Sequence, residues 1–279
     1  MLVDLSHYGC PELPPELFTF KEITRLVLRA HSLKTVSPDI RQLINLILLD
    51  LCSFNMKNRE CHTFLDKLPD AICHLRKLVQ LDLSYNGLLA FPDNAHQLTS
   101  LRYLSLASNR LTDVPVTMFK LRNLQFLSLR NNKLSFLHAD VGKLAALNYL
   151  DVAQNMIEEI PASLGQCKML STLLLDSISI GALPESFREL HSLTLLDLSN
   201  NRRLQSLPAG LHKLEHLTAV HVVGCHPDIV KCRELHSLHK VLVRNKMSLL
   251  ADTQCKKQLP IEHNFDLHME RPIELVTQE

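Results

Sequence analysis

The chain has 279 residues, of which 46% are hydrophobic and 21% are charged, so it can bury a continuous core and is not a mainly disordered chain. Its 30 Lys and Arg residues balance 29 Asp and Glu residues, and the formal net charge of +1 gives no overall field that would collect nucleic acid or anionic lipid. We therefore expect neither a nucleic-acid partner nor a membrane partner, and we expect a monomer.

Residues 1–22 carry a partial copy of a pattern that residues 23–225 repeat. The partial copy begins at the fourth position of the pattern, and its matching residues are Val3, Leu5, Cys10, Leu13, Leu17 and Phe20. Met1 therefore lies in the middle of a predicted strand. This partial repeat is either an abbreviated cap or the result of a chain shortened at its N-terminus, and the sequence leaves both explanations open.

Residues 23–225 contain nine copies of the pattern L-x-x-L-x-L-x-x-N-x-L. The copies begin at residues 23, 46, 78, 101, 124, 147, 170, 193 and 217. In the x-L-x-L-x segment the two Leu side chains point to one face of a strand, and the x side chains point to the other. Stacked copies then form a parallel sheet over one continuous Leu core. The Asn amide can pair with backbone groups that the inward turn would leave unsatisfied.

The second half of the copies places a hydrophobic residue before Pro, as in Phe91-Pro92 and Val114-Pro115. Together with the usual spacing of 23 residues, this resembles the intracellular, Ras-scaffold type of leucine-rich repeat, over about residues 2–225. The resemblance implies an α/β solenoid whose curved parallel sheet forms a concave face. It also implies a non-enzymatic scaffold or adaptor in intracellular signalling that binds another protein on that face.

Three copies depart from the pattern. The copy at 46 carries nine extra residues, an insertion at about 55–63 that we expect to bulge from the edge of the concave face. This insertion is either a recognition loop or a tolerated surface loop. The copies at 170 and 217 have Ile178 and Cys225 in the Asn position. After Cys225 the apolar spacing predicts a C-terminal helical cap over 226–250 and then a tail over 251–279.

The cysteines and the missing targeting signals bear on the cellular compartment. We recognise no secretory signal, transmembrane span or lipidation motif in the sequence. The eight cysteines form no C-x-x-C pair. We therefore expect reduced thiols, including those of Cys10 and Cys167, and a cytoplasmic location, with the nucleus as the alternative.

Motifs for catalysis or cofactor binding are missing, because none of G-x-G-x-x-G, G-x-x-x-x-G-K-[ST], G-x-S-x-G and H-E-x-x-H occurs. The fifth position of the pattern is acidic in four copies, at Asp50, Asp82, Asp151 and Asp197. Aligned carboxylates could form a metal or acid–base site, but Asp is ordinary at this position of the repeat type, so we interpret these residues as structural or solvated. His and Cys residues gather after residue 224, without the paired spacing that structural zinc sites usually have. We predict no enzyme activity, no cofactor and no metal.

The third position of the pattern points to the predicted concave face and is aromatic in three consecutive copies, at Tyr103, Phe126 and Tyr149. Aromatic residues on the solvent side of a rigid scaffold are typical binding hot spots. The other candidate site residues are Tyr85, Arg130, Asp151, Asp176 and Asp197, with Arg130 as a charged anchor and the three Asp residues as an acidic flank. The alternative is that the aromatic rings only cover one another and stabilise the sheet.

Three functions therefore compete. A protein-binding scaffold or adaptor ranks first, on the aromatic residues and the repeat type. A substrate-recognition subunit of a ubiquitin ligase, whose C-terminal segment would dock to the ligase, ranks second because we find no convincing ligase motif. An enzyme built on the four Asp residues ranks last, because no nucleophile or cofactor motif supports it.

Overall fold

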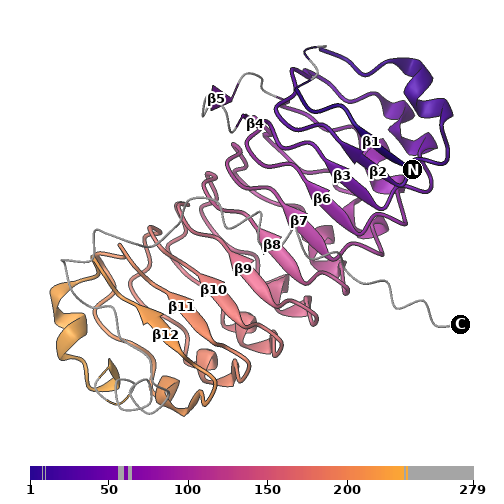
Figure 1. Cartoon of the computed structure of the whole chain (residues 1–279). Helices are drawn as coiled ribbons and strands as arrows, with labels where there is room; N and C mark the ends of the chain where they lie inside the picture. Colours follow the sequence, from indigo (N-terminus) through magenta and orange to yellow (C-terminus); the bar gives the residue numbers. More distant parts are fainter. Residues whose placement is uncertain (8, 10, 56–59, 62–64, 236, 238–279) are drawn as a thin grey trace, which may run out of the picture.

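The computed structural model describes residues 1–7, 9, 11–55, 60–61, 65–235 and 237 (Figure 1). Within these residues, ten parallel strands form one sheet in chain order, and Figure 1 shows them side by side along an elongated solenoid. They are β1 (Leu2–Asp4), β2 (Arg25–Val27), β3 (Leu48–Asp50), β6 (Gln80–Asp82), β7 (Tyr103–Ser105), β8 (Phe126–Ser128), β9 (Tyr149–Asp151), β10 (Thr172–Leu174), β11 (Leu195–Asp197) and β12 (Ala219–His221). The predicted solenoid fold is confirmed.

The outer side of each repeat unit, or coil, is a short 3-10 segment instead of an α-helix. These segments are η1 (Pro15–Thr19), η2 (Pro38–Gln42), η3 (Asp70–His74), η4 (Ala95–Gln97), η5 (Val116–Lys120), η6 (Ala139–Lys143), η7 (Ala162–Gln166), η8 (Glu185–Glu189), η9 (Leu211–Lys213) and η10 (Pro227–Lys231). Pro115 and Pro161 stand directly before η5 and η7 in extended backbone. Their fixed φ suits the start of a helical turn, and no sheet hydrogen bond is lost on this side.

The core is one cluster that runs from Leu13 to Leu235. The Leu residues of the strands point into it, and Leu127 of β8 is 0% exposed. The side chains that alternate with them point to the opposite side of the sheet, which we call the sheet face and which the sequence predicts to be concave. Neighbouring strands are in register, so that residues at the same position of the pattern pair across the sheet, as Leu104, Leu127 and Leu150 do.

In the regular coils, the turn after the strand depends on the Asn at the ninth position. Asn109 Nδ2 donates hydrogen bonds to the carbonyls of Leu83, Leu106 and Ala107, and its Oδ1 accepts one from the Leu88 N–H. The residue before the Asn position has a positive φ in most coils, with values of 51–63° for non-glycine residues and 73° for Gly224. In the coil at 23 the ninth position is His31, a buried histidine whose Nδ1 accepts from the Leu33 N–H.

The insertion leaves the sheet without breaking its register. β4 (Phe54–Asn55) and β5 (Glu60–Cys61) form a separate antiparallel pair, while β3 pairs directly with β6. The rest of the insertion, including Lys57, Arg59 and His62, lies outside the described residues. The other irregular coil has Ile178 at the ninth position, where its side chain is buried in the core.

Both ends of the solenoid are partly described. In the first coil Phe20, which matches the pattern, is 50% exposed, and Phe18 is 2% exposed and packs in the core instead. At the other end Ile229 and Leu235 are buried against the last coil. Residue 236 and residues 238–279, with most of the predicted cap and the whole predicted tail, lie outside the described residues. No helix among the described residues has the length and apolar character needed to cross a membrane.

Candidate functional site on the sheet face

Three aromatic side chains form one stack in the middle of the sheet face. Tyr103, Phe126 and Tyr149 are paired residues of β7, β8 and β9. The ring centroids are 4.3 Å apart in both pairs, with interplanar angles of 12° and 9°. This spacing is close to the strand separation of about 4.8 Å, so the sheet itself aligns the rings. We call these three residues the aromatic stack.

The three side chains of the aromatic stack are half-buried. Burial raises the pKa values of the Tyr103 and Tyr149 hydroxyls, and nearby carboxylates raise them further. Both side chains therefore stay neutral at physiological pH. The stack presents a row of ring edges with two neutral hydroxyls, which suits a partner surface of mixed apolar and polar character.

Tyr85 takes a different position from the three stacked residues. It belongs to the turn after β6, where it adopts a φ of 58° and its N–H donates to the Ala107 carbonyl. Its side chain is half-buried. Sequence spacing placed Tyr85 near the aromatic stack, and the structure assigns it to the turn edge of the sheet face.

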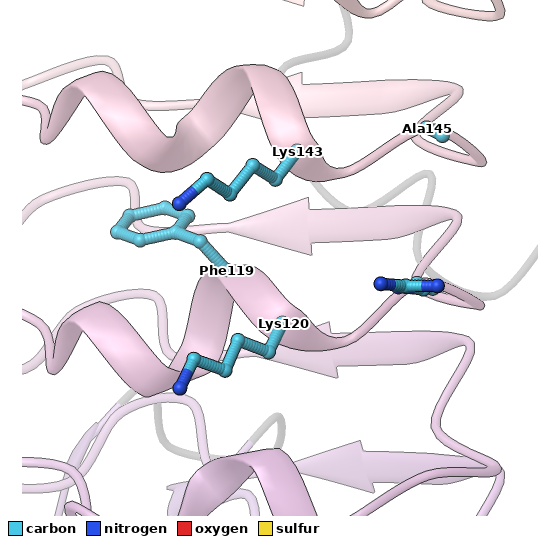
Figure 2. Close-up of a pocket in the computed structure, with 5 residues that line it drawn as sticks. Phe119, Lys120, Lys143 and Ala145 are labelled. Carbon is cyan, nitrogen blue, oxygen red and sulfur yellow. The ribbon is translucent and has the colours of Figure 1, made fainter.

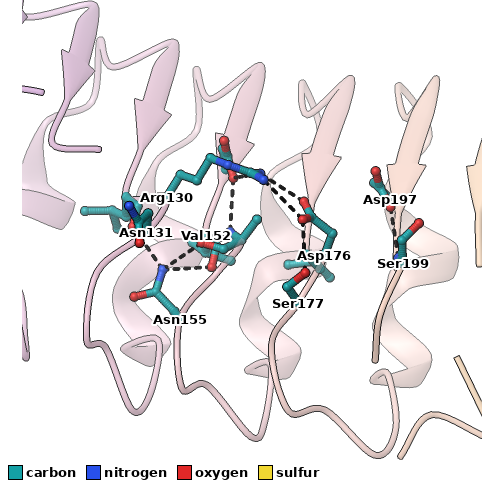
Figure 3. A network of polar contacts seen from close by, with 12 residues as sticks. Arg130, Asn131, Val152, Asn155, Asp176, Ser177, Asp197 and Ser199 are labelled. Atoms are coloured by element: carbon teal, nitrogen blue, oxygen red, sulfur yellow. Dashed lines mark hydrogen bonds and ion pairs between the residues drawn. The ribbon is translucent and has the colours of Figure 1, made fainter. Parts of the chain in front are cut away.

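Arg130 lies in an intramolecular ion-pair network. Its guanidinium donates to both carboxylate oxygens of Asp176, at 3.0 and 3.2 Å, and its Nη1 lies 3.7 Å from Asp151 Oδ1. Figure 3 shows Arg130 reaching across the intervening strand to Asp176. The side chain of Arg130 is only 20% exposed. The predicted charged anchor and two members of the predicted acidic flank therefore bind one another.

The third acidic residue of the flank, Asp197, pairs with a residue that the sequence did not single out. His221 Nδ1 lies 3.3 Å from Asp197 Oδ2 on the neighbouring strand. Burial by itself would raise the pKa of Asp197, but hydrogen bonds from His221 and Ser199 outweigh it and lower the pKa. Comparing the fifth position across neighbouring coils could have found this pair, because residues at one position become neighbours in a parallel sheet.

A second acidic group lies on the other side of the aromatic stack. Asp50 and Asp82 are paired residues of β3 and β6, and Arg29 Nε donates to Asp50 Oδ2 at 2.7 Å. Burial, together with the neighbouring Asp50 charge, raises the pKa of Asp82 to about 7. Of the four Asp residues that the pattern grouped, only Asp50 and Asp82 are neighbours in the sheet. Ser105 and Ser128 separate them from Asp151, and Leu174 separates Asp151 from Asp197.

The four Asp residues share one structural role. The Oδ1 atom accepts a hydrogen bond from the backbone N–H two residues later in each case, and the four acceptors are Asp50, Asp82, Asp151 and Asp197. Each carboxylate is nearly fully buried, so the structural interpretation holds and the solvated one was wrong. Burial raises the pKa of Asp151 to about 6, against the opposing effect of Arg130.

The described His, Cys, Asp and Glu side chains bear on metal and thiol chemistry. In the described part of the chain, no three His, Cys, Asp or Glu side chains are grouped so that they could hold a metal ion. Among the described cysteines, Cys73, Cys167 and Cys225 are free thiols. Burial raises the pKa of Cys73 to about 12 and that of Cys167 to about 11, which makes both thiols poor nucleophiles. Cys10 and the late residues Cys255, His263 and His268 lie outside the described residues.

Comparison with known proteins supports the repeat. A family described as leucine-rich repeat region matches residues 135–260, and a family described as leucine rich repeat matches residues 99–157. No curated protein sequence matches the chain.

Several solved structures share the fold at low sequence identity. The leucine-rich repeat domain of the type III effector XCV3220 (XopL) is 23% identical, with a TM-score of 0.67 over 82% of this chain and 77% of that one. An internalin, InlF of Listeria monocytogenes, is 23% identical, with a TM-score of 0.61 over 84% of this chain and 68% of that one. The functional domain of InlJ from Listeria monocytogenes is 22% identical, with a TM-score of 0.66 over 92% of this chain and 54% of that one. Identities this low establish the fold alone.

Proposed function

Since this chain is a leucine-rich repeat protein, we propose that it binds another protein on its sheet face and acts as a scaffold or adaptor without catalytic activity of its own. Domains of this fold generally bind proteins. The family resemblance of the 23-residue repeat supports a role in intracellular signalling assemblies, in the cytoplasm or the nucleus. The free, buried thiols of Cys73 and Cys167 fit a reducing compartment.

The aromatic stack is the observation that carries this proposal. Three large rings occupy the solvent side of the sheet, although the Leu core on the other side already satisfies the packing of each coil. Because neighbouring strands and rings hold each side chain, little conformational entropy is lost when a partner covers the stack. Central aromatic side chains of this kind typically contribute about 2 kcal/mol or more each at an interface.

The charged groups on either side of the stack refine the proposal. Arg130 forms ion pairs with Asp151 and Asp176, and Asp197 is hydrogen-bonded to His221, so each of these side chains already has a partner within the chain. Exposed edges of such pairs usually adjust specificity more than affinity. We therefore assign the affinity to the aromatic stack and the selection of the partner to the ion pairs beside it.

The test compares partner capture by the wild-type chain with capture by Phe126→Ala and Tyr149→Ala, using affinity purification and mass spectrometry. Leu195→Ala is the matched control, because Leu195 is a half-buried apolar residue at the same position of the pattern on β11. Capture should fall by about tenfold or more for each aromatic change, since about 1.4 kcal/mol corresponds to one decade. The Leu195 change should leave capture within about threefold.

The competing explanation is that the stack only stabilises the sheet. In that case the aromatic variants would lose stability and retain every partner in proportion to the folded fraction. Capture that survives both aromatic changes in folded protein would move the binding site away from the stack.

A further inference from the structure

Basic side chains that are far apart in the sequence meet at one edge of the solenoid. This edge is formed where each 3-10 segment returns to the next strand, and its members are Arg76, Lys77, Arg102, Lys120 and Arg122. All five are exposed. They lie in the segments that lead into three consecutive strands, because β6, β7 and β8 are neighbours in the sheet. We call this set the basic edge.

In the described part of the chain, the cations of the basic edge form no ion pair with a carboxylate. The sequence has no Asp or Glu within residues 71–81, 94–112 or 114–139. Among the described residues, none of the five cations forms an ion pair, and Lys77 donates to the neutral Asn45 Oδ1 at 2.7 Å. The nearest acidic residue after residue 113 is Asp140, whose carboxylate binds Lys143 at 2.6 Å and also interacts more weakly with the charge of Lys120.

The basic edge is hollowed between coils. One hollow is lined by Arg76, His96, Gln97 and Thr99. A second is lined by Phe119, Lys120, Arg122, Lys143 and Ala145, and Figure 2 shows Lys120 and Lys143 extending from consecutive 3-10 segments with Phe119 between them. Each hollow therefore combines cations of one coil with side chains of the next, so that a carboxylate entering it would meet a positive charge.

We propose that the basic edge is a second docking surface, which binds an acidic segment of a polypeptide rich in Asp and Glu. This inference goes beyond the sheet-face function and does not depend on it. Two strand spacings of about 4.8 Å separate the three coils, so the set spans roughly 10 Å along the solenoid. An extended peptide places side chains on one face about every 7 Å, so two or three carboxylates can reach the edge together. The guanidinium groups of Arg76, Arg102 and Arg122 can each bind a carboxylate in a bidentate way.

A polypeptide fits this surface better than nucleic acid or a membrane. Single-stranded nucleic acid usually needs exposed aromatic faces on which bases stack. The ring faces of the nearby aromatic stack cover one another at 4.3 Å, and Phe119 is buried. Long polyanions and lipid surfaces respond to the field of a whole molecule, and this chain has a formal net charge of only +1. A local cluster of unneutralised cations matches a short run of carboxylates.

The test measures fluorescence anisotropy of a labelled ten-residue peptide of alternating Glu and Ser at low salt. The basic-edge variant carries Arg76→Glu, Arg102→Glu, Lys120→Glu and Arg122→Glu. The matched control carries Lys34→Glu, Lys67→Glu, Lys133→Glu and Arg202→Glu, which make the same charge change at exposed positions of the opposite edge. We expect peptide affinity to fall by about tenfold or more in the basic-edge variant and by less than about threefold in the control.

Additional measurements distinguish binding at the basic edge from binding at the aromatic stack, and attraction between charges from other effects. A variant with Gln at the four basic-edge positions should also lose the peptide, which shows that attraction is removed and not only repulsion added. Phe126→Ala should leave peptide affinity within about twofold, because the two surfaces are distinct. A peptide with Gln in place of Glu should bind at least about tenfold more weakly.

Equal weakening by the two fourfold charge reversals would overturn the proposal, because total charge alone would then explain binding. Absence of peptide binding to the wild-type chain would overturn it as well. So would tighter binding of a ten-nucleotide single strand of DNA, or of vesicles containing phosphatidylserine, that is lost in the basic-edge variant.

Discussion

The regular central coils and the two coils that directly follow an irregular coil differ in the hydrogen bonds of the Asn position. Asn132, in a central coil, donates three hydrogen bonds to backbone carbonyls, and its Oδ1 accepts one from the Leu111 N–H of the preceding coil. Asn86 and Asn201 donate the corresponding bonds, but their buried Oδ1 atoms have no partner among the described residues.

The preceding coil accounts for each unpaired atom. The insertion stands before Asn86, and the coil with Ile178 stands before Asn201. The apolar core continues through both irregular coils, since Leu49, Leu173 and Ile180 are fully buried. The Leu core is therefore continuous through an irregular coil. The hydrogen bonds that link the Asn of one coil to the backbone of the preceding coil, which we call the polar ladder, are interrupted there. Each prediction below tests one side of this comparison.

The largest expected effect is a loss of core packing that is equal in the two kinds of coil. Leu127→Ala in a central coil and Leu173→Ala in the irregular coil at 170 should each cost about 2–5 kcal/mol of unfolding free energy, because each removes a fully buried Leu. Chemical denaturation measures both. A cost below about 1 kcal/mol for either would contradict the common core.

Substitution of the Asn residues should cost different amounts of stability in the two kinds of coil, whereas substitution of core Leu residues should not. Asn132→Ala removes four hydrogen bonds and should cost about 2–3 kcal/mol, since several backbone groups are left unpaired. Asn201→Ala should cost about 1 kcal/mol less, because one amide oxygen is already unpaired and one of its bonds is long, at 3.5 Å. Equal costs for the two substitutions would show that the hydrogen bond accepted by Asn132 Oδ1 contributes nothing to stability.

The carboxylate next to the insertion should make stability depend on pH. The pKa of Asp82 is raised in the folded chain to about 7, so its protonated form is favoured there, and this stability is lost as pH rises from about 4 to about 7. Asp82→Asn should therefore stabilise the chain by roughly 1–2 kcal/mol at pH 8 and change it little at pH 4. Unfolding curves at the two pH values test this, and a pH-independent effect would refute it.

The aromatic stack should matter less for folding than the adjacent core residue. Phe126→Ala should lower stability by no more than about 1 kcal/mol, although Phe126 is larger than Leu127, because only its contacts on the sheet face are lost. The two neighbouring substitutions are compared by chemical denaturation under one condition. A loss of unfolding free energy for Phe126→Ala as large as that for Leu127→Ala would mean that the aromatic stack mainly stabilises the fold.

The smallest expected effect concerns the insertion. Deleting 55–63 should leave the melting temperature nearly unchanged, because β3 already pairs with β6 without help from the inserted segment. Calorimetry measures this. Unfolding of the deletion variant would show that the inserted segment is structural.

The sequence by itself determined the fold, the register of the sheet and the two faces of each strand. These follow from a period of two along the strand and from the 23-residue repeat, both of which are local patterns. The register places Leu127 in the core and Phe126 on the sheet face, as the pattern predicts. The alignment of Tyr103, Phe126 and Tyr149 needs only the repeat, because equal positions in a parallel sheet become neighbours.

Only the tertiary structure decided which charges neutralise one another. Arg130 and Asp176 are 46 residues apart, and their contact depends on the length and direction of a side chain that crosses a whole strand. The same holds for the basic edge, whereas the pairing of Asp197 with His221 follows from their shared position of the pattern on neighbouring strands. Charged side chains have several rotatable bonds, so a repeat pattern fixes where each begins, and the packing of neighbouring coils fixes where its charge lies.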